Sequence, residues 1–169
     1  MSVLLPRAPR HRDLDRRELR ELVGRIAAEP EAWAHLVRRG GAERHFEQLW
    51  RDDHVDVWVI SWTRGSDTGF HDHDVSCGAV AVVEGEIVEE RLVLGGAPRR
   101  LPHRAGESFD FGASHVHRMR HDSDAVAVSI HAYSPPLWRM GTYTTGRDGT
   151  LRRESISYAE ELRPVDAAA

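Results

Sequence analysis

The sequence has no lysine, a single cysteine and no long apolar run. The one cysteine, Cys77, excludes an internal disulfide framework, which is typical of a reducing compartment. No stretch reaches transmembrane length and none resembles a signal-peptide core, so we expect a cytoplasmic protein without a membrane partner. The 23 basic residues, all arginine, are outnumbered by 27 acidic ones, giving a formal net charge of -4. This balance argues against a nucleic-acid surface.

A chain of 169 residues, of which 40% are hydrophobic, indicates one domain with a substantial core. Its first part has helical character. Apolar residues recur at helical spacing over residues 13–28, with Asp13 or Asp15 as the N-cap. Pro30 suits the first turn of a second helix, which we predict over residues 31–38.

Beyond residue 41 the pattern changes to short, alternating segments rich in β-branched residues and separated by turn residues. Such spacing predicts a mainly β protein, built as a closed or sandwich-like barrel. We divide the chain into an N-terminal helical segment (1–41), a barrel (42–160) and a tail (161–169), in a single domain overall. The predicted strands cover residues 54–62, 77–83, 86–94, 99–103, 108–111, 115–119, 125–133, 140–144 and 150–157.

Two histidines, His71 and His73, are the first sign of a functional site. Side chains two apart on a strand point the same way, so both imidazoles can face one point. A third histidine from a neighbouring strand can complete one face of a metal's coordination shell and leave positions open for substrate and dioxygen. Asp72 and Asp74 should point away by the same alternation.

The spacing around these histidines resembles the first motif of the cupin superfamily. Gly65 is followed by five residues, then by His71 and His73, then by Gly78 where most cupins have Glu, and finally by Gly85. The resemblance implies a cupin double-stranded β-helix barrel of the jelly-roll type, with N-terminal α-helices and with a metal in its mouth.

A weaker match to the second cupin motif starts at Gly106 and chooses His117 as the third ligand. His115 would lie on the same strand face and is the alternative ligand. His121 falls where cupins have Asn, so we expect it to make a structural hydrogen bond.

In lacking Glu in the first motif, the sequence resembles the cysteine dioxygenase family, a thiol dioxygenase branch of the cupins. The segment Ser129-Ile-His131-Ala-Tyr133-Ser134-Pro135-Pro136 is similar to that family's Ser-x-His-x-Tyr-Ser-Pro-Pro signature. The resemblance implies a hydrogen-bonded relay of Ser129, His131 and Tyr133 as the catalytic residues beside the metal, and a Ser-Pro bond that can be cis.

By the same resemblance, His71, His73 and His117 bind one ferrous iron, Fe(2+), per chain. Three neutral ligands leave the iron its full double charge, which favours the thiolate form of a substrate. The implied reaction adds both atoms of dioxygen to the sulfur of a small thiol and yields a sulfinic acid. We expect the partners to be a small-molecule thiol and dioxygen, and the protein to be a monomer or small homo-oligomer.

The substrate is less defined, because family members that take cysteine hold its carboxylate with an Arg in a Tyr-x-Arg-type segment. Aligned from His71 without gaps, that Arg position falls on Phe46. One interpretation is that another arginine supplies the clamp from a shifted place. The other, which we favour, is a different thiol or thione, such as a thioimidazole, that suits Phe46. The candidate arginines are Arg44, Arg51, Arg64 and Arg118.

Some family members carry a cysteine cross-linked to the relay tyrosine, and the corresponding position here is Gly78. Cys77 is one residue away, hence on the opposite strand face, so we predict no thioether to Tyr133 unless a bulge occurs at Gly78. We favour Cys77 as a buried small hydrophobe, with a place beside the substrate as the alternative. Trp62 or Trp58 is expected to pack and to form part of the pocket wall.

Two rival functions are a metal-dependent cupin isomerase or lyase and a non-catalytic ligand-binding cupin. The first would use zinc, manganese or nickel as a Lewis acid and would not consume dioxygen. The second would show ligand-induced thermal stabilisation without turnover.

Overall fold

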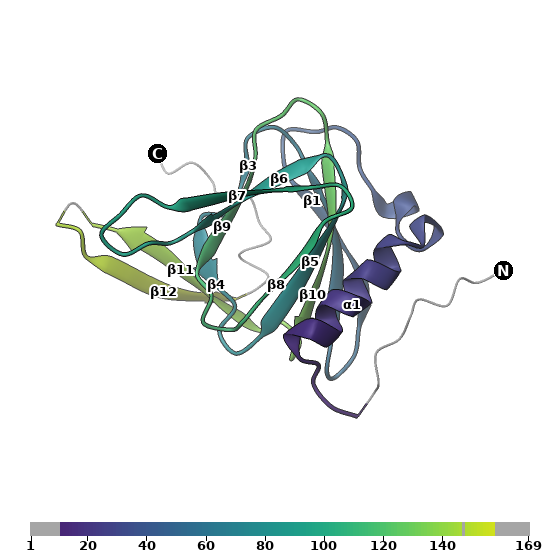
Figure 1. Ribbon diagram of the computed structural model, residues 1–169, viewed down its shortest axis with the longest axis horizontal. Coiled ribbons are helices and arrows are strands. Elements are labelled where there is room, and N and C mark those ends of the chain that lie inside the picture. Colours follow the sequence, from purple (N-terminus) through teal and green to yellow (C-terminus); the bar gives the residue numbers. More distant parts are fainter. Residues whose placement is uncertain (1–10, 147, 158–169) are drawn as a thin grey trace.

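The computed structural model describes residues 11–146 and 148–157, and its fold is mainly β, with one N-terminal α-helix (Figure 1). The helix α1 (Arg16–Ala27) is followed by two short 3-10 turns, η1 (Pro30–Ala32) and η2 (Ala34–Leu36). The tail over residues 161–169 lies outside the described residues, and the division into segments stays a prediction. No helix within the described ranges is long and apolar enough to cross a membrane.

Asp15, one of the two predicted N-caps, caps helix α1. The Asp15 carboxylate accepts from the backbone N–H of Glu18 at 2.9 Å, and the Glu18 carboxylate accepts from the backbone N–H of Asp15. This reciprocal capping box satisfies two N–H groups that have no partner within the helix. The buried face of α1 consists of Leu19, Leu22, Val23 and Ile26.

The predicted second α-helix over residues 31–38 is wrong, because the chain forms only η1 and η2 there. The two turns are separated by Trp33, whose φ of -136° is not helical. The Trp33 ring is buried, and its indole N–H donates to the carbonyl oxygen of Ile26 at 3.1 Å. Forming the first turn of a helix is unfavourable, and a short helix gains few further hydrogen bonds to offset that free energy. The packing of the large Trp33 side chain therefore decides the backbone conformation.

The strands form two antiparallel sheets, as in a jelly roll, rather than one continuously paired barrel. The five-stranded sheet has the order β1-β2-β10-β5-β8, and the seven-stranded sheet has the order β12-β11-β4-β9-β6-β7, with β3 paired to β9. The first sheet consists of β1 (His45–Arg51), β2 (Asp56–Trp62), β5 (Cys77–Glu84), β8 (Ser108–Phe111) and β10 (Ala127–Ser134). The second consists of β3 (Ser66–Asp67), β4 (Phe70–Asp72), β6 (Glu86–Arg91), β7 (Arg99–Arg104), β9 (His117–His121), β11 (Arg139–Thr145) and β12 (Leu151–Ser157).

Strand β1 was not among the predicted strands. Its sequence, His-Phe-Glu-Gln-Leu-Trp-Arg, has no β-branched residue, and its register against β2 shifts between Gln48 and Trp50. It forms the edge of its sheet and is mostly half-buried. The extended conformation of β1 therefore depends more on its pairing with β2 than on the pattern of its own side chains.

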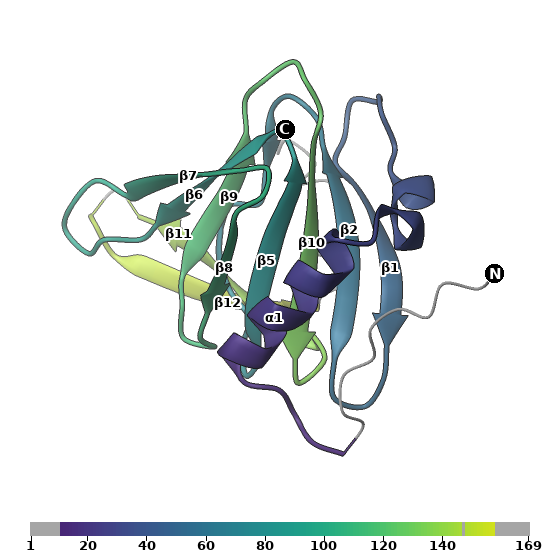
Figure 2. The same cartoon turned by 45° about the vertical axis from the view of Figure 1, so that its right-hand side comes forward.

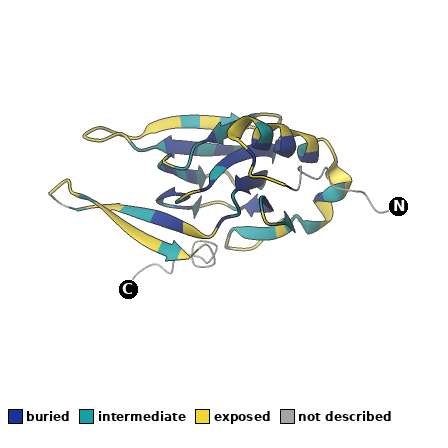
Figure 3. Ribbon diagram, turned by 90° about the horizontal axis from the view of Figure 1, so that it is seen from below, coloured by how far each residue is buried: buried dark blue, intermediate teal, exposed yellow. Residues whose placement is uncertain are grey.

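The five-stranded sheet is buried on both faces, because α1 lies across its outer face, over β5 and β10 (Figures 2 and 3). Val57 and Val59 of β2 pack toward α1, whereas Trp58, Ile60 and Trp62 of the same strand pack between the sheets. Such two-sided burial explains why β2 and β10 are buried along their whole length. It also defines an inner face, on which the candidate site lies.

Candidate metal centre

Three buried histidines meet between the sheets. His71 lies on β4, His73 follows that strand directly, and His117 begins β9, where it is paired with His71. One ring nitrogen from each residue lies within 4.8 Å of the others. The structure thus brings together the three residues that the sequence predicted as ligands, and their role as ligands stays a prediction.

Hydrogen bonds fix two of these rings. His71 Nδ1 lies 3.0 Å from the carbonyl oxygen of Gly69, and His117 Nδ1 lies 3.0 Å from a carboxylate oxygen of Glu89. Both partners are acceptors, so each Nδ1 donates, and Nε2 is left for a metal. His73 Nδ1 is buried without a hydrogen-bond partner among the described residues.

The three imidazoles are neutral. Burial lowers the pKa of His71 and of His73 well below the usual value, and the neighbouring histidines add to this effect. Burial also lowers the pKa of His117, although Glu89 opposes the shift. Neutral imidazoles with available nitrogens are the form that binds a transition metal.

Glu89, which the sequence analysis missed, lies on β6 behind His117. It is fully buried and also accepts from His115 Nε2 at 2.8 Å and from Arg91 Nε at 3.0 Å. Burial alone would raise the pKa of Glu89, but hydrogen bonds from His103, His115 and His117 outweigh it and hold the pKa far below the usual range. The alternative ligand His115 therefore contacts Glu89 and is not one of the three clustered histidines.

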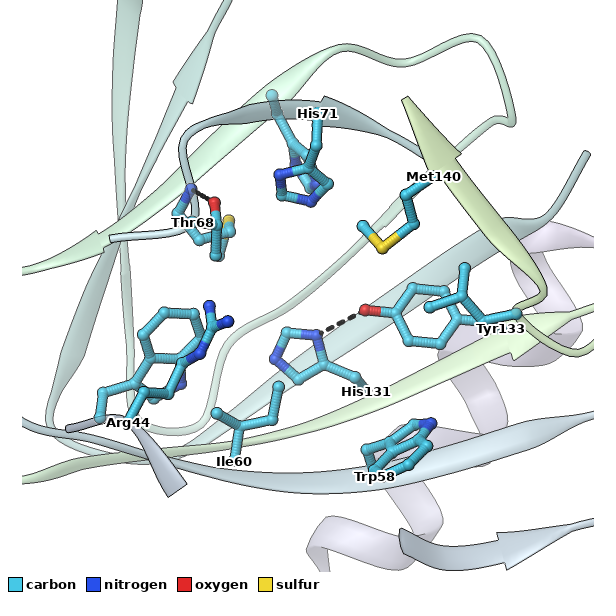
Figure 4. A pocket seen from close by; sticks show the side chains of 12 residues that line it. Arg44, Trp58, Ile60, Thr68, His71, His131, Tyr133 and Met140 are labelled. Atoms are coloured by element: carbon cyan, nitrogen blue, oxygen red, sulfur yellow. Dashed lines mark hydrogen bonds between the residues drawn. The ribbon is translucent and has the colours of Figure 1, made fainter. Parts of the chain in front are cut away.

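The predicted relay is present on the inner face of β10. Ser129 Oγ lies 2.7 Å from His131 Nε2, and His131 Nδ1 lies 3.2 Å from the Tyr133 hydroxyl (Figure 4). The bond from Ser134 to Pro135 is cis, as the resemblance implied. Trp62 extends the relay, because its indole N–H donates to Ser129 Oγ at 2.8 Å.

Trp62 sets the direction of these hydrogen bonds. An indole N–H can only donate, so Ser129 Oγ accepts from it. The buried Ser129 hydroxyl then satisfies its own proton by donating it to His131 Nε2, 2.7 Å away. His131 then carries its proton on Nδ1 and donates it to the Tyr133 oxygen. Burial lowers the pKa of His131 to about 3, so the ring is neutral and has only this one N–H. The Tyr133 proton is thereby directed away from His131.

A cavity of about 40 Å³ lies beside His71, His117 and Tyr133. Figure 4 shows Arg44, Thr68, His71, Met140 and Tyr133 around it. Most of its wall is apolar, and of the described residues that line it only Arg44 carries a full charge. The remaining lining residues are Trp58, Ile60, Trp62, Met119, His131 and Leu137.

The predicted substrate-binding residues divide into two groups. Arg44 and Trp62 line the cavity, with the Arg44 guanidinium 5.3 Å from the centre of the Trp62 ring. Phe46 does not line it and packs edge-on against Trp58, with 6.1 Å between ring centres. The other three arginines also lie outside the lining, each beside a carboxylate: Arg51 with Asp56, Arg64 with Asp124 and Arg118 with Asp67.

Gly78 lies directly across from Tyr133, and the space beside it is taken by an aromatic ring. A Cβ at Gly78 would be 2.5 Å from Phe111 Cζ and 3.1 Å from Tyr133 Cδ1. Cys77 faces α1 instead, with its Sγ 3.3 Å from the carbonyl oxygen of Ser134. The register irregularity of β10 against β5 occurs at Val128, so no bulge at Gly78 turns Cys77 inward.

Two further expectations concern residues beside the histidines. Asp72 points away from them and accepts from Arg153 and Tyr143, which ties the β11–β12 hairpin to β4. His121 faces the carbonyl oxygens of Glu86 and Ala125 at 2.8 and 2.6 Å, in the structural role predicted for it.

Two facing antiparallel sheets with a histidine cluster between them define a cupin. A model of the cysteine dioxygenase type I family matches residues 9–145, and the chain belongs to that family. Solved structures show the same fold. A protein from Bacillus halodurans is 20% identical, with a TM-score of 0.51, over 75% of this chain and 84% of that one. A cupin superfamily protein from Desulfitobacterium hafniense is 12% identical, also with a TM-score of 0.51, over 61% and 87%.

Proposed function

We propose that this protein is a non-haem iron thiol dioxygenase that oxidises a small thiol to its sulfinic acid. The observation that carries the proposal is the meeting of three neutral imidazoles, with no carboxylate in their group, beside the Tyr133 relay. The family supports a cupin-type metal enzyme, for which thiol oxidation is the expected chemistry.

The donor set fits ferrous iron. Imidazole suits iron, and one ring nitrogen from each of three buried histidines lies within 4.8 Å of the others. Ferrous iron on His71, His73 and His117 would supply a double positive charge that favours thiolate over thiol, together with positions for dioxygen.

Tyr133 acts as a hydrogen-bond donor within the cavity. Because Trp62 and Ser129 favour the His131 form with its proton on Nδ1, the Tyr133 oxygen accepts there and its own proton is available to the oxygen atoms of substrate or product. A donor held in place before reaction stabilises developing negative charge without reorganisation.

Arg44 supports a substrate with an anionic group. Its guanidinium is at the cavity wall, and Phe46, two residues further, is not. Arg44 would therefore bind a substrate carboxylate from a position two residues before Phe46, just ahead of β1. We propose a small thiol with a carboxylate, of which cysteine is one example, ahead of a thioimidazole.

The test is to load the protein anaerobically with ferrous iron, add individual thiols, admit air, and record oxygen uptake and product mass. Uptake with a gain of two oxygen atoms in the product supports the proposal. Turnover without oxygen uptake would indicate the isomerase or lyase, and ligand-induced stabilisation without turnover would indicate a binding protein. The cytoplasmic location and the monomeric or small homo-oligomeric state stay predictions.

A further inference from the structure

We infer that Glu89 is a positioning residue for His117 and brings a negative charge to the metal centre through that imidazole. The inference rests on the proposed metal site. Glu89 is not part of either cupin motif. Among the described residues it is hydrogen-bonded to His117 and not to His71 or His73.

The geometry fixes which atoms take part. Strand β6 pairs with β9, and the fully buried Glu89 carboxylate lies 3.0 Å from His117 Nδ1. A carboxylate only accepts, so His117 donates there and presents Nε2 to the metal. His71 instead donates to the neutral carbonyl oxygen of Gly69. The two proposed ligands therefore differ in their hydrogen-bond acceptor, which is an anion for His117 and a neutral carbonyl for His71.

In most cupins a glutamate is itself a metal ligand. Here a carboxylate, Glu89, instead accepts a hydrogen bond from the proposed ligand His117. The usual Glu position is Gly78, and Phe111 occupies the space beside it. An imidazole that donates to a carboxylate is a stronger electron donor than one that donates to a carbonyl, and it is held in one orientation and tautomer. Glu89 would therefore give a bound metal part of a carboxylate's effect without itself being a ligand.

The surroundings of Glu89 favour this role over that of a second metal ligand. Glu89, His115 and His117 also form a group close enough to hold an ion. However, the Arg91 guanidinium is 3.0 Å from the second Glu89 oxygen, where it opposes a nearby cation. Arg91 and His115 instead fix the carboxylate in the orientation that His117 uses.

The matched variants are Glu89→Gln and Glu90→Gln. Glu90 is the next residue of β6 and is also buried, but its ion-pair partners are Arg100, Arg118 and Arg120. We expect Glu89→Gln to weaken Fe²⁺ and Co²⁺ affinity by about 10- to 100-fold and to raise the ferric/ferrous midpoint potential. Glu90→Gln should leave both near the wild-type values. Equal affinity and potential in wild type and Glu89→Gln would overturn the inference.

A measurement on the wild-type protein applies even if Glu89→Gln does not fold. In the Zn²⁺-loaded, ¹⁵N-histidine-labelled protein, we expect NMR to show His117 protonated at Nδ1 and coordinated at Nε2, with one metal per chain. An unprotonated His117 Nδ1, or two metals per chain, would overturn the inference. These readouts do not use thiol oxidation, so a protein that shows them without oxidising thiols would overturn only the proposed function.

Discussion

At the scale of single residues, the site depends on which atom carries each proton. Histidine offers two nitrogens, and the acceptors at Gly69 and Glu89 leave Nε2 of His71 and His117 for a metal. Trp62 acts in a similar way on the relay, because its N–H can only donate and makes Ser129 Oγ an acceptor, which favours donation of the Ser129 proton to His131. The protonation of the candidate site residues is thus set by the hydrogen-bond partners next to them.

Tyr133→Phe removes one hydroxyl and leaves the metal cluster unchanged. We expect iron content to equal that of wild type and kcat for thiol oxidation to fall by about 100- to 1000-fold, the range for losing one preorganised donor. Iron analysis and oxygen uptake measure the two effects separately. Loss of iron in this variant would mean that Tyr133 has a different role.

Trp62→Phe tests the direction of the relay. Without the indole N–H, Ser129 Oγ loses a donor that it accepts from, so the His131 form that donates from Nε2 to Ser129 becomes more favourable than in wild type. We expect a lower kcat with little change in KM, and in the ¹⁵N-histidine spectrum a shift of His131 from the Nδ1–H form toward the Nε2–H form. An unchanged tautomer of His131 would contradict the argument.

Arg44→Gln tests the anionic part of the substrate. A hydrogen bond to a charged group contributes about 1.5–3 kcal/mol, so we expect KM for carboxylate-bearing thiols to rise by about 10- to 100-fold. Uncharged thiols such as a thioimidazole should be nearly unaffected. The control is Arg64→Gln, because Arg64 is exposed beside Asp124 and lies outside the cavity wall. An equal loss for charged and uncharged thiols would argue against a carboxylate clamp.

At the scale of elements, strand alternation predicted both the inner face and its residues. Ser129, His131 and Tyr133 are two apart on β10, and the structure places all three between the sheets. The same rule placed Cys77 on the opposite face from Tyr133. Strand β1 escaped prediction because its pairing with β2 decides its conformation. Glu89 escaped because the sequence of β6 does not tell which of its glutamates contacts a histidine from β9.

Gly78→Ala tests the packing between β5 and β8. The added methyl group would meet the Phe111 ring at 2.5 Å, and overpacking of this kind costs about 1–3 kcal/mol of unfolding free energy. Urea unfolding measures the change, and Gly112→Ala is the control, since no atom lies within 4 Å of its added Cβ. Recovery of stability in the double variant Gly78→Ala, Phe111→Leu would identify the ring as the cause.

At the scale of the whole molecule, the fold holds several imidazoles neutral in a buried layer between two sheets. The sequence could predict this cluster from the spacing of three histidines, but not the extent of their burial, which depends on α1 and on both sheets. Because burial lowers the pKa of His131 to about 3 and lowers those of His71, His73 and His117, the folded protein resists protonation there. The unfolded chain does not, since an unperturbed histidine has a pKa of about 6.5.

Stability of the metal-free protein should therefore depend on pH. Between about pH 6.5 and 5 the unfolded state binds more protons than the folded state, so the free energy of unfolding falls as the pH falls. Each fully neutral buried histidine contributes up to about 1.4 kcal/mol per pH unit in this range. Urea unfolding at pH 7, 6 and 5 with a chelator present measures the slope. His131→Gln should reduce this slope by the contribution of one histidine. An unchanged slope in that variant would show that His131 is protonated in the folded protein.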